Sequence, residues 1–262
     1  MLIKVTNYCS MGCSHCMENS TVAGHHMTRE IFDKALDLTA RLEGYAWENG
    51  IPPLILLSGG ECTEHPDIVA YIEEVMRRGW FPVLITNGMW LDKPELKESI
   101  LRPEWHDKIT IQITNDPTFY PSRPKEVPED ARIAFIQKIT QLVPLGRTKK
   151  KDATGEYPLK RAPTSFNLRS ATRSYRDVRA ALLLHRSRGL GGIGGNCTPS
   201  ISSDGTLVAG ETNSCFPIGN VDSTAREVTL ALMNMTCNKC GLVDNLTQEQ
   251  KIAIGESRIH LP

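Results

Sequence analysis

Short apolar runs alternate with longer amphipathic stretches through the first half of the chain. The run at residues 54–57, Leu-Ile-Leu-Leu, has no polar alternation, which is typical of a strand buried on both faces of a parallel sheet. Similar runs lie at residues 2–5 and 83–85 and begin again at Ile109. Between them, residues 28–42 and 66–79 carry apolar side chains at mostly three- and four-residue steps, which predicts amphipathic helices. The repeated order of strand and helix predicts an α/β fold with a right-handed parallel sheet.

The pattern weakens after residue 117. Isoleucines at 133, 136 and 139, followed by Val143, predict a helix, residues 178–185 predict another, and residues 165–168 suggest a strand. The glycine-rich stretch 189–195 is interpreted as a linker, because no strand-to-helix context supports a phosphate-binding loop. Asp204-Gly205, flanked by apolar runs, predicts a β-hairpin. We therefore divide the chain into a core at 1–190 and a C-terminal appendage at 196–262.

Composition narrows the function classes. The 262 residues carry 30 basic and 30 acidic side chains, so no global field directs the protein to nucleic acid or membrane. No apolar run approaches the ~18 residues of a membrane span, and no leader pattern is present. Together with the free thiols, this predicts a cytoplasmic protein.

One region departs from this neutral balance. Residues 147–188 hold twelve basic and three acidic side chains. We interpret this run as a solvated face, and the alternative is a patch for a phosphorylated or nucleic-acid substrate.

Cysteines supply the strongest chemical signal. Cys9, Cys13 and Cys16 lie within eight residues, directly after the first apolar run, and can turn toward one point. A 4Fe–4S cluster held by three thiolates keeps one iron open to a small molecule. Two alternatives are a zinc site completed by His15 and a set of buried thiols.

Three further motifs end the later apolar runs. Ser58-Gly59-Gly60-Glu61 ends the second, Thr86-Asn87-Gly88 the third and Gln112-Ile113-Thr114-Asn115-Asp116 the fourth. In a parallel α/β barrel, the carboxyl ends of the strands form the face on which sites are built. Together with the CxxxCxxC spacing, this order resembles the radical S-adenosylmethionine (radical SAM) enzymes. The resemblance implies a partial (β/α)6 parallel barrel with a small C-terminal hairpin-and-helix appendage.

The resemblance also implies residue roles. Cys9, Cys13 and Cys16 would hold a 4Fe–4S cluster whose open iron is chelated by S-adenosylmethionine. Three groups of residues would bind the rest of that molecule: Ser58, Gly59, Gly60 and Glu61 at the methionine amino end, Gln112, Thr114 and Asn115 at the ribose and carboxylate, and His15 against the adenine. For His15, Thr114 and Asn115 the alternative is ordinary loop packing. Reduction by a flavodoxin or ferredoxin would cleave the cofactor to methionine and a 5′-deoxyadenosyl radical.

The C-terminal part has its own thiols, Cys197, Cys215, Cys237 and Cys240, which can close a zinc site or hold a second cluster. The spacing of Cys197, Gly210 and Cys215 resembles the start of the SPASM extension of radical SAM enzymes. Because the later SPASM cysteines are absent, it is most similar to the shortened "twitch" form, which carries one auxiliary 4Fe–4S cluster. Cys62 is interpreted as an incidental small residue.

An auxiliary cluster with every iron ligated would transfer electrons. We therefore expect a two-electron oxidation, either dehydrogenation of an alcohol carbon or modification of a peptide side chain. The alternative is a redox-neutral isomerisation or rearrangement on a nucleotide, a nucleic-acid base or an amino-acid adduct. Two non-catalytic hypotheses are a zinc-stabilised binding module and a degenerate scaffold that senses S-adenosylmethionine.

Candidate substrate residues are Tyr120, Arg169 and Glu211. Glu211 lies four residues before Cys215 and can act as the base that takes the proton released on oxidation. The alternative interpretation of Glu211 is a solvent-facing residue of the hairpin without a catalytic role.

Overall fold

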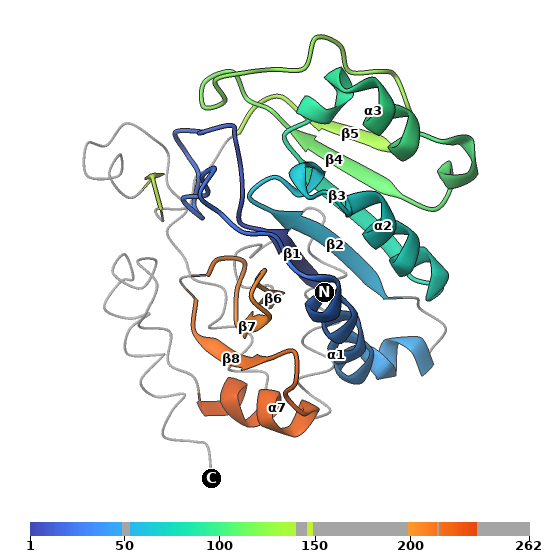
Figure 1. Cartoon of the computed structure of the whole chain (residues 1–262). Coiled ribbons are helices and arrows are strands. Elements are labelled where there is room, and N and C mark those ends of the chain that lie inside the picture. Colours follow the sequence, from blue (N-terminus) through green and yellow to red (C-terminus); the bar gives the residue numbers. More distant parts are fainter. Residues whose placement is uncertain (49–52, 140–145, 149–198, 214, 235–262) are drawn as a thin grey trace.

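The computed structural model describes residues 1–48, 53–139, 146–148, 199–213 and 215–234 (Figure 1). Several sequence-based predictions fall outside these residues. They are the helix at 178–185, the strand at 165–168, the linker at 189–195, Arg169, Cys197, Cys237 and Cys240.

One eight-stranded sheet organises the described residues, in the order β5-β4-β3-β2-β1-β6-β7-β8. Strands β1 to β5 are parallel to their neighbours, and β6 pairs parallel with β1 on the other side. The mixed α/β fold with a parallel sheet is therefore confirmed. The strands are β1 (Leu2–Thr6), β2 (Leu54–Gly59), β3 (Phe81–Thr86), β4 (Thr110–Thr114), β5 (Ile133–Ile136), β6 (Ser200–Ile201), β7 (Thr206–Val208) and β8 (Pro217–Asn220).

Helices α1 (Arg29–Glu48), α2 (Ile68–Arg77) and α3 (Pro94–Ile100) lie along one side of the parallel strands, as Figure 1 shows. The apolar periodicity explains this, since Ile68, Ile72 and Val75 share one stripe of α2 and are fully buried. Gly79, at φ +73°, ends that helix in the left-handed region. The helical elements are α1 (Arg29–Glu48), η1 (Cys62–Glu64), α2 (Ile68–Arg77), η2 (Met89–Asp92), α3 (Pro94–Ile100), η3 (Pro103–Trp105) and α7 (Ala225–Asn234).

Side chains of β1 alternate between the two faces of the sheet. Ile3 and Val5 are fully buried in the hydrophobic core. Lys4 and Thr6 point to the opposite face, and both are also buried. The central strand is thus covered on both faces, as the apolar runs predict.

The predicted helix over residues 133–143 is wrong at its start. Residues 133–136 form β5, in register with β4 through Gln112 and Ala134. Ile133 and Phe135 pack against the core while Ala134 and Ile136 are exposed. This two-residue alternation, with β-branched and aromatic side chains, favours a strand over the three-residue spacing of the isoleucines.

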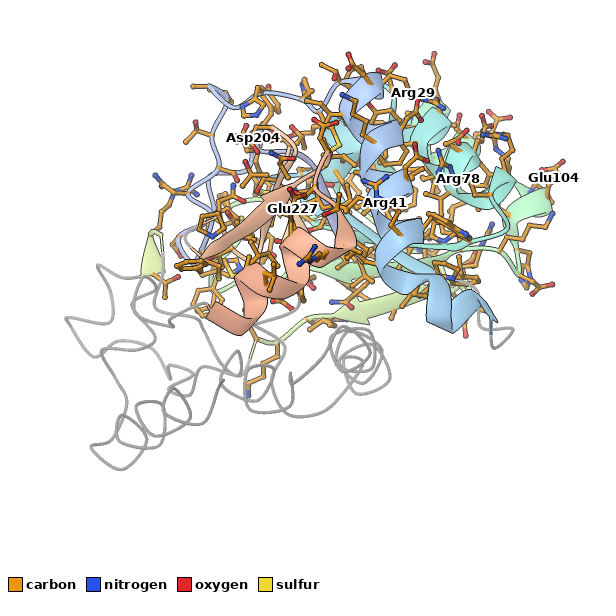
Figure 2. All side chains as sticks on the ribbon, turned by 90° about the horizontal axis from the view of Figure 1, so that it is seen from below. Arg29, Arg41, Arg78, Glu104, Asp204 and Glu227 are labelled. Atoms are coloured by element: carbon orange, nitrogen blue, oxygen red, sulfur yellow. The ribbon has the colours of Figure 1, made fainter. Side chains whose placement is uncertain are left out.

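The predicted hairpin at Asp204-Gly205 is confirmed. Strands β6 and β7 pair antiparallel, and Gly205 has φ +86°. Helix α7 packs against β8 and α1, and its first turn is a capping box in which Thr224 N–H donates to the Glu227 carboxylate over 2.7 Å. Arg41, on α1, donates to the Val221 carbonyl over 3.0 Å (Figure 2). The appendage therefore extends the core sheet.

Within the described ranges, none of the helices combines the length and apolarity needed to cross a membrane.

Candidate functional site

The site is built around residues 7–28, here called the cysteine loop, which follows β1 at its carboxyl end. The loop is closed on itself by backbone hydrogen bonds from Asn7 N to His25 O at 3.0 Å and from Cys9 N to Thr21 O at 3.1 Å. Its cysteines are free thiols, with Cys13 buried and Cys9 and Cys16 half-buried. All four sequence motifs follow the carboxyl ends of β1 to β4, as predicted.

The three thiols influence one another. Burial, together with the negative charges of Glu61, Glu64 and Cys16, raises the pKa of Cys9 to about 11. Burial and the charges of Cys9 and Cys16 raise the pKa of Cys13 to about 12. With pKa values raised in this way, a metal centre would be needed to hold these side chains as thiolates.

Three thiols on one loop are a donor set suited to a 4Fe–4S cluster. Across the described part of the chain, no three His, Cys, Asp or Glu side chains converge on a position for a single metal ion. A 4Fe–4S cluster does not need such convergence, because each thiolate binds a different iron. Cys9, Cys13 and Cys16 would hold it.

Two glycines let the end of β2 lie against the start of the cysteine loop. A Cβ on Gly59 would stand 2.1 Å from the Thr6 carbonyl oxygen, and one on Gly60 would stand 2.2 Å from the Tyr8 oxygen. The close approach allows Gly60 N to donate to Thr6 O at 2.8 Å and Glu61 N to donate to Tyr8 O at 2.9 Å. Glycine is the only residue that permits both contacts.

The Glu61 carboxylate links the ends of β2 and β3. It is buried, and it accepts from the Thr63 and Thr86 hydroxyls at 2.6 Å each and from Asn87 N at 2.7 Å. Burial raises the pKa of Glu61, and these donors act in the opposite direction. The Thr-Asn-Gly motif that ends β3 thus supplies two of the hydrogen-bond donors to Glu61. The predicted contact of Glu61 with the methionine part of S-adenosylmethionine stays a prediction. Neighbouring Cys62 is buried, with its thiol donating to Ile85 O at 3.1 Å, and serves packing.

At the end of β4, Asn115 is fully buried. Its Nδ2 donates to Asn87 O at 2.9 Å and to Ser122 O at 3.1 Å, whereas its Oδ1 accepts no hydrogen bond from the part of the chain described. Gln112 and Thr114 lie on the face of β4 opposite the core-facing isoleucines, consistent with a role at the open face. Their predicted ligand contacts stay predictions.

An aromatic wall stands beside the thiols. The His15 ring lies 4.8 Å from the Tyr120 ring and 5.1 Å from the Phe119 ring, centroid to centroid. Burial lowers the pKa of His15 to about 4, so the imidazole is neutral. Burial, together with the negative charges of Cys13, Glu61, Cys16 and Cys9, raises the pKa of Tyr120. Phe119 was not predicted, although it precedes Tyr120 in the chain.

Two carboxylates help to anchor the loop, one on η1 and one within the loop itself, and neither was predicted. Glu64, on η1, accepts from Ser10 N at 2.9 Å, next to Cys9. Glu18 pairs with Lys4 at 2.6 Å, and Lys4 also donates to the Asn213 side chain at 3.0 Å. The second network ties the cysteine loop to the appendage.

The predicted auxiliary site is only partly described. Cys215 is half-buried on the connection from β7 to β8, with its Sγ 3.6 Å from the Thr212 hydroxyl. Glu211 is half-buried on the same connection. The three other cysteines of this group lie outside the described residues.

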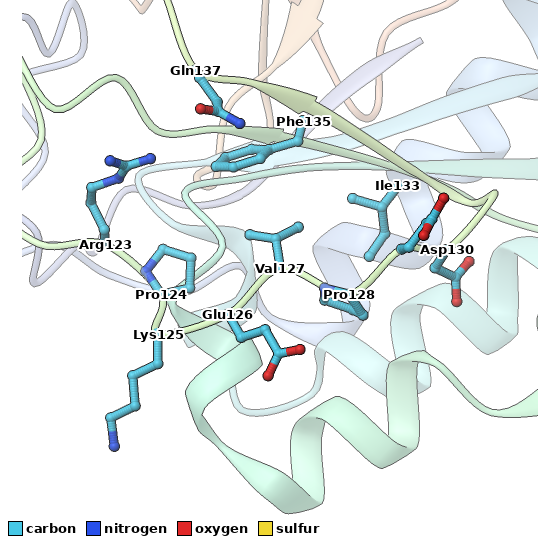
Figure 3. Close-up of a pocket in the computed structure, with 11 residues that line it drawn as sticks. Arg123, Pro124, Lys125, Glu126, Val127, Pro128, Asp130, Ile133, Phe135 and Gln137 are labelled. Atoms are coloured by element: carbon cyan, nitrogen blue, oxygen red, sulfur yellow. The ribbon is translucent and has the colours of Figure 1, made fainter.

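A cavity of about 640 Å³ lies away from the thiols, between β5 and residues 123–130 (Figure 3). It forms because the connection from β4 to β5, residues 115–132, is turns and proline-rich coil rather than a helix. None of its lining residues is a predicted site residue, so we do not place the reaction there.

Comparison with known proteins gives the family. The model of the radical SAM superfamily matches residues 3–145, more than half of the chain. No curated protein matched the sequence. Among solved structures, native anSMEcpe with bound AdoMet and the Cp18Cys peptide is 15% identical with a TM-score of 0.48, over 96% of this chain and 85% of that one.

SuiB of Streptococcus suis bound to S-adenosylmethionine is 12% identical with a TM-score of 0.47, over 93% of this chain and 71% of that one. At such identity and TM-score, neither structure informs ligand or substrate. The family match covers the cysteine loop and the strand ends that face it, and the chain belongs to the radical SAM superfamily.

Proposed function

We propose that the protein is a radical SAM oxidoreductase that removes two electrons from a small-molecule or peptide substrate. Family membership implies a 4Fe–4S cluster and reductive cleavage of S-adenosylmethionine. The observation that carries the proposal is the meeting of the cysteine loop and the Gly59-Gly60-Glu61 motif at one carboxyl edge of the sheet, where Glu61 N donates to Tyr8 O at 2.9 Å beside Cys9.

When bound, the cluster and S-adenosylmethionine supply, on addition of one electron, a 5′-deoxyadenosyl radical that removes a hydrogen atom from a substrate carbon. Side chains and backbone groups of the protein orient the reacting molecules and exclude water from them. The neutral His15 ring and the ring of Tyr120 form an apolar wall beside the thiols. The glycine pair of β2 presents backbone groups at the same edge.

Completing the oxidation requires one further electron and one proton to leave the substrate. We assign the electron to an auxiliary 4Fe–4S cluster on Cys197, Cys215, Cys237 and Cys240, and the proton to Glu211 as base. The contacts of Asn213 with Lys4 and of its N–H with Glu18 at 3.3 Å support this assignment, because they fasten the Cys215 connection to the cysteine loop.

The reductant would be a flavodoxin or ferredoxin of the cytoplasm. The sequence raised a phosphorylated or nucleic-acid substrate as an alternative, based on the basic run that starts at Arg147. Arg147 itself donates to the Cys13 and Ser20 carbonyls of the cysteine loop, so its guanidinium is already engaged within the protein.

Metal content and product analysis test the proposal. Anaerobically reconstituted protein and a Cys9/Cys13/Cys16→Ala variant are assayed for iron, sulfide and zinc, then for 5′-deoxyadenosine and methionine after reduction with dithionite. We expect about eight irons in the parent, about four in the variant, and products only from the parent. About four irons in the parent with one zinc in each protein would favour the redox-neutral alternative. No iron, or no cleavage by the iron-loaded parent, would contradict the proposal.

A further inference from the structure

Residues 146–148 lie against the cysteine loop through contacts between residues that are at least 127 positions apart along the chain. Arg147 donates from its backbone N to Cys16 O at 3.0 Å and from Nη1 to Cys13 O at 2.7 Å. Its Nη2 donates to Ser20 O. The hydroxyl of the fully buried Thr148 donates to His15 O at 2.8 Å. One short segment thus binds four carbonyl groups between the second cysteine and the end of the thiol-bearing turn.

Gly146 makes this approach feasible. It has φ +56°, and a Cβ there would stand 2.5 Å from Cys16 O and 2.6 Å from Met17 O. A side chain would therefore push the segment away from the loop. The backbone of Gly146 therefore packs directly against the backbone of Cys16 and Met17.

The guanidinium also brings a fixed positive charge to the thiols. Arg147 is half-buried, which limits screening by solvent. Its Nη1 lies 2.7 Å from the Cys13 carbonyl oxygen, so the positive charge stands beside the residue that carries the second thiol. A cluster gains one negative charge on reduction, and nearby charge and hydrogen bonding set its potential.

We propose that Arg147 is a positioning residue of the cluster site: it fixes the cysteine loop through two carbonyls, and its charge raises the reduction potential of the cluster. The inference rests on cluster binding by Cys9, Cys13 and Cys16 and goes beyond the family match, which ends at residue 145. It also corrects the interpretation of residue 147 as part of a solvated basic face.

The positioning half is tested on the protein without cluster, by hydrogen exchange. In Arg147→Gln the amides of residues 13–20 exchange about tenfold faster, because loss of one or two hydrogen bonds is worth about a tenfold change in opening. Amides of α2 provide the internal reference. The matched control is Arg123→Gln, which removes an exposed guanidinium and leaves loop exchange unchanged. Equal loop exchange in the parent and Arg147→Gln would overturn this half.

The charge half is tested on reconstituted protein by redox titration followed by electron paramagnetic resonance. Arg147→Lys keeps the charge but cannot span two carbonyls, so its loop exchanges faster while its potential stays near the parent value. Arg147→Gln lowers the potential by about 59 mV, a tenfold change for one electron. A merely structural role would leave all potentials equal at equal iron content, which would overturn the charge assignment.

Two checks separate the failure modes. If the parent takes up no iron, the cluster proposal itself fails, whereas the exchange experiment still decides the positioning role. If Arg147→Gln does not retain a cluster, the charge half is judged on Arg147→Lys. A reduction potential below the parent value in this variant, which keeps the positive charge, would contradict the inference.

Discussion

Replacing Gly60 by Ala tests whether the glycine pair of β2 is needed by the fold before any ligand binds. The added methyl would stand 2.2 Å from the Tyr8 carbonyl oxygen and 2.7 Å from the Tyr8 carbonyl carbon. The backbone must move, which strains the packing and breaks the bonds from Gly60 N to Thr6 O and from Glu61 N to Tyr8 O. Overpacking costs about 1–3 kcal/mol and each hydrogen bond about 1 kcal/mol, so we expect a loss of about 3 kcal/mol.

Thermal unfolding of the protein without cluster measures this effect. A loss of about 3 kcal/mol lowers Tm by roughly 6–12 °C in a chain of this size. The control is Gly12→Ala in the cysteine loop, where φ is +68° but no atom lies within 4 Å of the new methyl. It costs only the left-handed conformation, about 1 kcal/mol. A Gly60→Ala protein that unfolds no earlier than Gly12→Ala would refute the reasoning.

Two further predictions concern buried charge. Hydrogen bonds from Arg77, together with Arg78, hold the pKa of Glu74 at about 2, well below its ordinary value of 4.5. The resulting stability, roughly 2 kcal/mol after screening through exposed Arg77, is complete above pH 4.5 and is lost as pH falls toward 2. Urea unfolding across this range should show a flatter pH dependence in Glu74→Gln. Lys4→Met removes the ion pair of the largely buried Glu18 carboxylate, which keeps only the hydrogen bond from Asn213 N, and costs about 3 kcal/mol. The Lys4→Met/Glu18→Gln double variant recovers more than half of this loss, as a thermal double-mutant cycle would show. A double variant no more stable than Lys4→Met would exclude pairing as the cause.

Local patterns in the sequence predicted those features that depend on neighbouring residues. The four apolar runs became β1 to β4, since each is short, apolar and followed by a polar motif. The hairpin could be predicted because Asp204-Gly205 is a residue pair that strongly favours a tight turn between two strands. The motifs could be placed at one edge because parallel strands share a direction, without knowledge of any contact between them.

What the sequence did not reveal depends on distant partners. Residues 133–136 carry both a three-residue and a two-residue spacing of apolar side chains, and pairing with β4 selects the second. Arg147 was indistinguishable from the basic residues after it, because only the folded chain brings it to Cys13. The contacts of Glu64 with Ser10 and of Glu18 with Lys4 likewise could not be predicted from the spacing of residues in the sequence. For Arg147, Glu64 and Glu18, a single polar side chain acts across the fold, whereas for β5 the backbone pairing decides.

These distant contacts explain how the cysteine loop keeps a defined shape. Apart from isolated bridges, its roughly twenty residues form neither helix nor strand, so its backbone makes scattered hydrogen bonds, such as those from Asn7 N to His25 O and from Cys9 N to Thr21 O, and no regular ladder. Ordering a residue costs about 1–2 kcal/mol, and fixed contacts from outside the loop must offset that cost. Glu64 binds beside the first cysteine, Arg147 binds the carbonyl of the second, and Lys4 binds Glu18, two residues beyond the third. The backbone beside each cysteine therefore has its own anchor, on η1, on residues 146–148 and on β1.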